Sequence, residues 1–358
     1  MEIPISIVIP AYNQVEYCRQ CIDSIRANTR HSYRLVLVDN GSTDGVREYF
    51  DSVPNAEVVH CATNSGFAGG VNRGLERSRG HVVLLNSDTL VPEGWLERLE
   101  AALLSAPDIG MVGPRSNCVS GEQQIDGLEF ASMDEINAFA HDLAKRRSGA
   151  LTDMTRLVGF CCLIRESALA RVGPFDESFG IGNYEDDDYC LRLRAAGYRL
   201  CIAQDAFVFH YGSRTFLGMG VTGDKWQMLI DANQRRFEKK WRLTAEARHE
   251  AAQASLAFNA QACAARARGD FLAAVRLLKQ AIEAHPLLEI NFNDLGVVLC
   301  DLGQPERAVD QFVRALRLRA DYTEARQNLC ELATKLGRED KLAQWLRGPS
   351  ADGSEENP

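Results

Sequence analysis

The chain has 358 residues, of which 46% are hydrophobic and 25% charged, a balance typical of soluble globular proteins with two ordinary domains. Its formal net charge of −9 argues against the broadly basic surface with which nucleic-acid-binding proteins neutralise phosphates. We therefore expect no nucleic acid partner.

The apolar runs and the cysteines indicate the compartment. An apolar run opens the chain without a charged leader or a cleavable signal before it, and no run reaches the roughly 18 residues of a membrane span. Eleven cysteines, spread over expected helices and strands, indicate free thiols in a reducing compartment. We expect a cytoplasmic protein without disulfides, in which Cys18 and Cys21 occupy buried helix positions rather than a zinc or redox site.

Up to about residue 215, short apolar runs alternate with amphipathic segments, as in a largely parallel α/β fold. The pattern predicts strands over 5–10, 34–39, 57–60, 81–86, 110–113, 157–164 and 199–210. Between the early strands it predicts helices over 15–27, 43–51 and 67–79. Each of these helices follows a strand end, where open α/β sheets bind their ligands.

From residue 250 onward the sequence repeats itself with a spacing of 34 residues. The matched positions are Phe258 and Phe292, Gly269 and Gly303, Ala274 and Ala308, Leu278 and Phe312, and Ala281 and Ala315, continued by Gly337, Leu342 and Leu346. Small residues at helix crossings and a glycine at the turn resemble the tetratricopeptide repeat. We therefore expect an all-α repeat domain over 250–347 and a disordered tail over 348–358.

Residues 224–249 are expected to form a linking helix after a first domain over 1–223. Its packing positions are Trp226, Leu229, Phe237 and Trp241. Its basic side chains are typical of a solvated helix face, and peripheral attachment at the inner membrane surface is the alternative; they are Arg235, Arg236, Lys239, Lys240 and Arg242.

Polar residues gather where the expected strands end. Pro10 ends the first strand in IVIPAYNQ, Asp39 stands at the tip of the second in VDNGSTDG, and the glycines of NSGFAGGVNRG open a helix as a phosphate-binding loop would. Asn86 and Asp88 point the same way from the fourth strand, so they can converge on a hard cation or a sugar. Ordinary turns, close helix packing and helix capping explain the same residues one by one, and these alternatives stay open.

A run of four acids from Glu185 to Asp188 lies in YEDDDYCLR at an expected helix start. Such a run indicates a solvated helix start, or a place where a cationic or reactive group meets it. Asp187 and Asp188 are typical of solvated or structural acids, and Arg192 is spaced for an i, i+4 ion pair with Asp188. Taken alone, His210 is typical of a structural histidine.

Seven sequence blocks occur in order along the chain: IPAYN, VDNGSTD, NSGFAGGVNRG, LLNSD, VGFCCLIRESALARVGPFDESF, YEDDDYCLR and HYGS. Together they resemble the inverting glycosyltransferases of family 2 over roughly residues 3–215. The resemblance implies a GT-A fold, which is an α/β fold with a Rossmann-like, mostly parallel sheet. It also implies transfer of a sugar from a nucleotide-diphosphate donor, which we expect to be a UDP- or dTDP-sugar.

The resemblance also implies which residues bind the donor. These are Pro10, Ala11, Tyr12, Asn13, Asp39, Asn64, Gly66, Phe67, Ala68, Gly69, Arg73, Asn86, Ser87 and Asp88. The NSD segment stands where the family usually has two aspartates, so Asp88 and His210 would hold Mg²⁺ or Mn²⁺. Because Asn86 supplies an oxygen without charge, we expect this cation to bind more weakly than in the family.

The acid run and the preceding block would carry the chemistry. By resemblance, Asp186 is the catalytic base and Glu185 its neighbour on the acceptor side. Gly159 and Phe160 would form the wall beneath the sugar and the acceptor, although core burial explains Phe160 equally well.

The sequence leaves the acceptor and the role of the repeats open. The acceptor would be a hydroxyl or thiol of a glycan, a lipid-linked glycan, a peptide or a protein, and the repeats would bind it, form a homodimer or dock a partner. Two other classes compete. A sugar nucleotidyltransferase would need a glycine-rich loop where this chain has PAYNQ, and a non-catalytic nucleotide-sugar-binding scaffold would recruit partners through its repeats.

Overall fold

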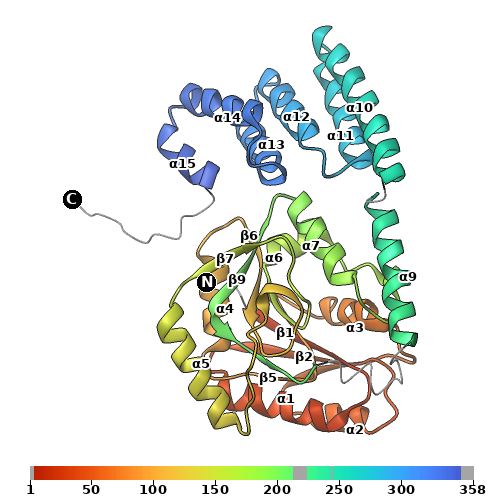
Figure 1. The fold of residues 1–358 in the computed structure, drawn as a ribbon, viewed down its shortest axis with the longest axis vertical. Coiled ribbons are helices and arrows are strands. Elements are labelled where there is room, and N and C mark those ends of the chain that lie inside the picture. The colour runs from red at the N-terminus through yellow and green to blue at the C-terminus, as the bar shows by residue number, and fades with distance from the viewer. Residues whose placement is uncertain (1–3, 213–223, 243–244, 348–358) are drawn as a thin grey trace, which may run out of the picture. The chain divides into compact units, whose positions relative to one another are not determined.

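A computed structural model describes residues 4–212, 224–242 and 245–347 (Figure 1). The chain divides into two compact units, one made of Met1–Leu193 with Tyr198–Gln234 and the other of Arg194–Gly197 with Arg235–Pro358. The predicted tail over 348–358 and residues 213–223 of the predicted first domain lie outside the described residues.

The first unit is built on an eight-stranded sheet with the order β3-β2-β1-β4-β8-β6-β9-β7. Its strands are β1 (Ile5–Ala11), β2 (Tyr33–Asp39), β3 (Ala56–His60), β4 (His81–Leu85), β6 (Ile109–Arg115), β7 (Leu151–Met154), β8 (Cys161–Ile164) and β9 (Arg199–Phe207). Two short strands, β5 (Thr89–Leu90) and β10 (Phe209–His210), pair antiparallel outside it. In the main sheet only β7 and β8 run against the others, which confirms the predicted α/β fold with a mostly parallel sheet.

Beyond shifts of one or two residues at strand ends, the predicted strands differ from the observed ones as follows. Residues 157–160 form an irregular approach to β8, because the backbone N–H groups of Val158 and Gly159 donate to side chains rather than to a strand. The run 199–210 is divided between β9 and β10, with Val208 between them. β7 was not predicted, because LTDM is short and half polar.

Helices cover both faces of this sheet (Figure 1). Ile7 and Ile9 of β1 face α1 (Val15–Asn28), α2 (Val46–Asp51) and α4 (Trp95–Leu104), whereas Val8 faces α3 (Gly66–Leu75), α6 (Glu166–Val172) and α7 (Glu185–Ala195). A further helix, α5 (Met133–Arg147), packs beside β9. The alternation of side chains along a strand therefore builds two cores from one sheet. All eleven cysteines are free, and Cys18 and Cys21 are buried in α1 as predicted.

One edge of the sheet collects the segments that form the site. Ala11 pairs with Asp39 at the carboxyl ends of β1 and β2, and Leu85 at the end of β4 pairs with Cys161 at the start of β8. Because β8 runs in the opposite direction, the residues before it lie at the same edge as the residues after β1, β2 and β4.

The second unit contains helix pairs in which each turn has a glycine. The pairs are α10 (Ala245–Ala267) with α11 (Phe271–Ala284), α12 (Glu289–Asp301) with α13 (Pro305–Leu318), and α14 (Thr323–Leu336) with α15 (Glu339–Arg347). Gly269, Gly303 and Gly337 occupy equivalent turns with φ of 79°, 67° and 61°, and Ala274 and Ala308 are fully buried. The 34-residue spacing thus corresponds to successive helix pairs, and their identity as tetratricopeptide repeats stays a prediction.

The predicted linking segment contains parts of two helices. α9 (Asp224–Lys240) covers most of the range 224–249, and α10 begins at Ala245. Within the described ranges, no helix is both long and apolar enough to cross a membrane.

Two adjacent alanines of α10 provide a matched test of packing in the second unit. Ala265 is 1% exposed, whereas Ala264 is exposed. We expect Ala265→Leu to destabilise the protein by about 1–3 kcal/mol, because the added atoms enter a filled core. The same change at Ala264 should stay within about 0.5 kcal/mol. Thermal unfolding followed by circular dichroism checks this, and equal melting temperatures of the two variants would contradict it.

Candidate active site

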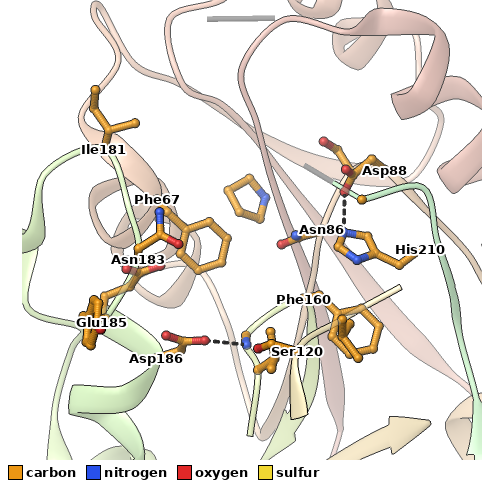
Figure 2. A pocket seen from close by; sticks show the side chains of 18 of the residues that line it. Phe67, Asn86, Asp88, Ser120, Phe160, Ile181, Asn183, Glu185, Asp186 and His210 are labelled. Atoms are coloured by element: carbon orange, nitrogen blue, oxygen red, sulfur yellow. Dashed lines mark hydrogen bonds and ion pairs between the residues drawn. The ribbon is translucent and has the colours of Figure 1, made fainter. Parts of the chain in front are cut away.

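A cavity of about 720 Å³ opens at the sheet edge where the strand ends meet (Figure 2). Its walls include the segments after β1, β2, β3, β4 and β6, the segment before β8, the first turn of α7, and parts of β10 and α9. The cavity brings together most of the predicted site residues, namely Pro10, Ala11, Tyr12, Asn64, Gly66, Phe67, Asn86, Ser87, Asp88, Gly159, Phe160, Glu185, Asp186 and His210.

Five predicted donor-binding residues do not line this cavity. Asp39 is 1% exposed, and its carboxylate accepts a hydrogen bond from Ser42 N at 2.8 Å and lies 3.2 Å from His60 Nδ1. Arg73 forms an ion pair with Glu76 on the surface of α3. The other three are Asn13, Ala68 and Gly69.

Asn40, which was not predicted, fixes the loop of residues 64–66 beside the cavity. Its Nδ2 donates to Gly66 O at 2.9 Å and to Asn64 Oδ1 at 3.1 Å, and its Oδ1 accepts from Ser65 N. Gly66 has φ of 78°, and a Cβ there would lie 1.8 Å from Gly180 O, so only glycine fits. Asn40 directly follows Asp39 in VDNG, but the sequence does not show which of the two side chains reaches the cavity.

The NSD segment contacts His210 at the cavity wall. The pairing of β5 with β10 places His210 opposite Thr89, and His210 Nε2 lies 3.2 Å from Asp88 Oδ1 (Figure 2). Burial disfavours the charged imidazolium, but the contacts with Asp88 and with the carbonyl of Cys118 outweigh it and raise the pKa of His210 above its ordinary value. Asn86 Oδ1 is buried in the cavity lining and accepts no hydrogen bond from the described residues.

These groups can take part in binding a divalent cation without enclosing it. Asp88 and Asn86 offer oxygen atoms, the ligands that Mg²⁺ and Mn²⁺ prefer, and His210 adds an imidazole. In the part of the chain that the structure describes, no three His, Cys, Asp or Glu side chains are grouped to hold a metal. The residues therefore fit a cation that takes its remaining ligands from a bound donor and from water.

Phe160 and Gly159 lie between the NSD segment and Asp186, and each is hydrogen-bonded to one of them. Phe160 is 2% exposed, and its ring stacks on His210 with centroids 5.2 Å apart. Asn86 N donates to Phe160 O at 2.8 Å. A Cβ on Gly159 would lie 3.3 Å from Asp186 Cβ, so the glycine leaves room for the Asp186 side chain.

Asp186 projects from the first turn of α7, and hydrogen bonds from backbone N–H groups to both of its carboxylate oxygens fix its orientation. Gly159 N donates to Asp186 Oδ2 at 3.1 Å (Figure 2). Asp187 N donates to Asp186 Oδ1 at 2.9 Å. Glu185 is 6% exposed, and its Oε2 is buried without a hydrogen-bond partner among the described residues. The structure therefore presents an ordered carboxylate to the cavity beside a buried acid.

Arg156 is the cation that contacts Asp186 and Asp187, and the sequence did not reveal it. Its Nε lies 2.5 Å from Asp187 Oδ1, its Nη2 lies 4.0 Å from Asp186 Oδ2, and its Nη1 donates to Ser120 Oγ. Four crowded acids imply such a partner, but Arg156 lies in an irregular segment with no motif of its own.

Burial and mutual repulsion shift the acids of this cluster. Burial and then the charge of Asp186 raise the pKa of Glu185 well above its ordinary value. The same two causes raise the pKa of Asp187 to about 6, although Arg156 opposes the shift. The cavity therefore carries less negative charge near neutral pH than a count of its acids implies.

Asp188 is buried and forms an ion pair within α7. It is fully buried and accepts a hydrogen bond from Arg192 Nε at 2.9 Å, which confirms the predicted i, i+4 ion pair. The solvated interpretation of Asp188 is wrong, because this side of α7 packs on the sheet. Further lining residues not predicted for the site include Ile181, Asn183, Tyr184, Trp226 and Ile230.

Part of this chain is similar to known glycosyltransferases. Residues 6–173 match the family described as glycosyl transferase family 2. Glycosyltransferase AglE of Haloferax volcanii is 25% identical over 218 residues, which cover 58% of this chain and 66% of that protein. Two further curated relatives are covered over 24% and 33% of their lengths, so the chain spans less than two thirds of these relatives.

Two solved structures are similar at low sequence identity. The mannosyltransferase PcManGT from Pyrobaculum calidifontis, in complex with GDP-Man and Mn²⁺, has a TM-score of 0.44 and 18% identity, covering 96% of this chain and 87% of its own. GalNAc-T7 with UDP, GalNAc and Mn²⁺ has a TM-score of 0.47 and 14% identity, covering 58% and 44%. Residues 6–173 of this chain are thus similar to glycosyl transferase family 2, and they belong to a mixed α/β sheet domain of the GT-A type.

Proposed function

We propose that this protein is an inverting glycosyltransferase that transfers a sugar from a UDP- or dTDP-sugar to a hydroxyl or thiol acceptor. The observation that carries the proposal is one cavity with residues 86–88 on one side and Asp186 on the other. Three buried polar atoms of its lining, Asn86 Oδ1, Asn183 Nδ2 and Glu185 Oε2, have no hydrogen-bond partner in the described ranges. A polar ligand in the cavity would satisfy them.

The donor would occupy the side formed by the strand ends. The nucleotide would lie against residues 10–12 and 64–67, which places its diphosphate near residues 86–88. Among the described lining residues, Arg156 is the only Arg or Lys, and it is already paired with Asp187. The lining therefore offers a diphosphate little positive charge, which favours binding together with a divalent cation.

Mg²⁺ or Mn²⁺ would be held by Asp88 and His210 with the amide oxygen of Asn86. When bound, the cation would supply Lewis-acid stabilisation of the charge on the departing diphosphate. Because Asn86 carries no charge, the donor diphosphate would supply more of the binding than in a site with two aspartates.

Asp186 would act as the general base. Its carboxylate would take the proton from the acceptor hydroxyl or thiol while the acceptor oxygen or sulfur attacks the anomeric carbon. The bond from that carbon to the diphosphate oxygen breaks, and the nucleoside diphosphate leaves with the electron pair. Attack from the face opposite the diphosphate inverts the anomeric configuration. The raised pKa of Glu185 keeps its carboxyl group protonated up to a higher pH than usual, so this group would donate a hydrogen bond on the acceptor side.

The helical unit would contribute to the choice of acceptor. We propose that its helix pairs are tetratricopeptide-like repeats that bind a peptide or protein acceptor, dimerise the enzyme or dock it to a partner that presents glycans. Removal of residues 250–358 tests this role. Unchanged transfer to a small saccharide and an unchanged dimer would leave the acceptor and dimer roles without support.

A panel of UDP-, dTDP- and GDP-sugars, tested by thermal shift with and without Mn²⁺, tests the proposed function. We expect one nucleotide class to raise the melting temperature in the presence of Mn²⁺, because a ligand that binds only the folded state stabilises it. Donor hydrolysis or transfer should follow for that class. Binding without turnover would favour a non-catalytic scaffold, and formation of a nucleotide sugar from a sugar phosphate would favour a nucleotidyltransferase.

Replacement of the proposed base separates catalysis from binding. Asp186→Asn should lower transfer by about 10²- to 10⁴-fold, because the amide cannot accept the proton, while donor affinity is kept. The same substitution at Asp142, an exposed acid on α5, is the matched control and should leave the rate unchanged. Wild-type turnover in Asp186→Asn would remove Asp186 from the role of base.

Asn86→Asp tests the proposed cation site. The added carboxylate should lower the Mn²⁺ concentration that gives half-maximal transfer, because a charged oxygen binds a hard cation more strongly than an amide. Asn86→Ala should raise it. A titration of transfer rate against Mn²⁺ measures both, and identical curves for the three proteins would contradict this site.

The acid cluster should make stability depend on pH. Because the pKa of Asp187 rises from an ordinary value of 3.8 to about 6 on folding, the folded protein binds the proton more tightly than the unfolded chain. Stability should therefore fall as pH rises through this window. Asp187→Asn lacks this titration, so its melting temperature should fall less than that of the wild type between pH 4 and pH 6. Parallel curves for the two proteins would contradict the shift.

A further inference from the structure

The segment that leads into the acids of α7 has an unusual backbone. Residues 180–184 follow the short turn Glu177–Phe179, and Ile181, Asn183 and Tyr184 line the cavity. Asn183 and Tyr184 have φ of 74° and 73°, a region that residues with a side chain rarely occupy. Two such residues in succession persist only where their surroundings hold them in place.

Asn233 of α9 supplies part of that hold. It is 1% exposed, and its Nδ2 lies 2.8 Å from Phe179 O, 2.8 Å from Gly182 O and 3.1 Å from Asn183 O. A single side-chain amide therefore lies within hydrogen-bond distance of three backbone carbonyl oxygens of the segment. Asn233 belongs to the same compact unit as the cavity but does not line it.

The loop of residues 64–67, which we propose borders the nucleotide, fixes the opposite side of the segment. Phe67 N donates to Ile181 O at 3.1 Å, and Gly180 O packs against Gly66. The segment is thus held between the loop 64–67 and α9, and it passes directly into α7, where Tyr184 O accepts from Asp188 N. A shift of the segment would move the first turn of α7 relative to the loop 64–67. The Asp186 carboxylate would move with that turn.

We propose that Asn233 is a positioning residue for the reaction, which holds residues 179–183 so that Asp186 lies at the correct place opposite the donor side. The inference rests on the proposed function of Asp186. Asn233 touches no substrate in this account and acts only through the segment.

Asn233→Ala and Asn233→Asp test the proposal. The aspartate has the same shape but cannot donate, and its oxygens would face three carbonyl oxygens. We expect both variants to lower kcat by about 10- to 100-fold, because a small misplacement of a catalytic group is costly. The donor KM should change less than kcat, since the segment contacts residues 66 and 67 of the proposed nucleotide pocket, while residues 10–12 and 86–88 are unaltered. Hydrogen exchange should accelerate locally in residues 180–188.

Ser6→Ala is the control for a structural effect. Ser6 is fully buried, and its Oγ donates to Arg79 O at 2.8 Å at the end of β1 remote from Pro10. This variant should lower the melting temperature while keeping kcat and the exchange of residues 180–188. An Asn233→Ala enzyme with wild-type kcat, or with exchange in 180–188 no faster than in Ser6→Ala, would overturn the proposal. A wild-type protein that transfers no sugar would overturn the proposed function instead, and the exchange comparison would still decide whether Asn233 holds the segment.

Discussion

The antiparallel pairing of β4 with β8 is the constraint on which the site depends. In a sheet whose other central strands run in parallel, this reversal brings the start of β8 to the edge where β4 ends. Asn86 N can then bond to Phe160 O, and the adjacent Gly159 N reaches Asp186. A parallel β8 would place residues 159 and 160 at the opposite edge. Residues 86–88 and the acids of α7 therefore share one cavity because one strand is reversed.

Most of the fold and much of the site could be predicted from the sequence, for physical reasons. Buried strands and strand-end polar residues have strong local patterns, so Pro10, the NSD segment and the acid run were all placed at the correct ends of elements. Arg156 could not be found, because an arginine in an irregular segment has no local signature and its partners lie 30 residues later. The burial of Asp188 and the presence of Asn40, rather than Asp39, in the cavity lining likewise depend on tertiary packing.

The two sides of the cavity have different electrostatic properties. On the donor side, Asp88 and His210 lie in contact beside an amide oxygen that no described residue satisfies. On the other side, Asp186 is bonded at both oxygens, while burial raises the pKa values of Glu185 and Asp187. Arg156 offsets part of the repulsion among these acids. One side thus suits a cation with an anionic donor, and the other suits removal of a proton from an acceptor.

A crystal structure of the Asp186→Asn variant with a nucleotide sugar and Mn²⁺ tests the central claim most directly, because the variant should bind the donor without consuming it. We expect the diphosphate beside Asn86 and Asp88, the nucleotide against residues 10–12, and the anomeric carbon facing residue 186. A donor bound elsewhere, or one whose diphosphate lies between the anomeric carbon and residue 186, would contradict it.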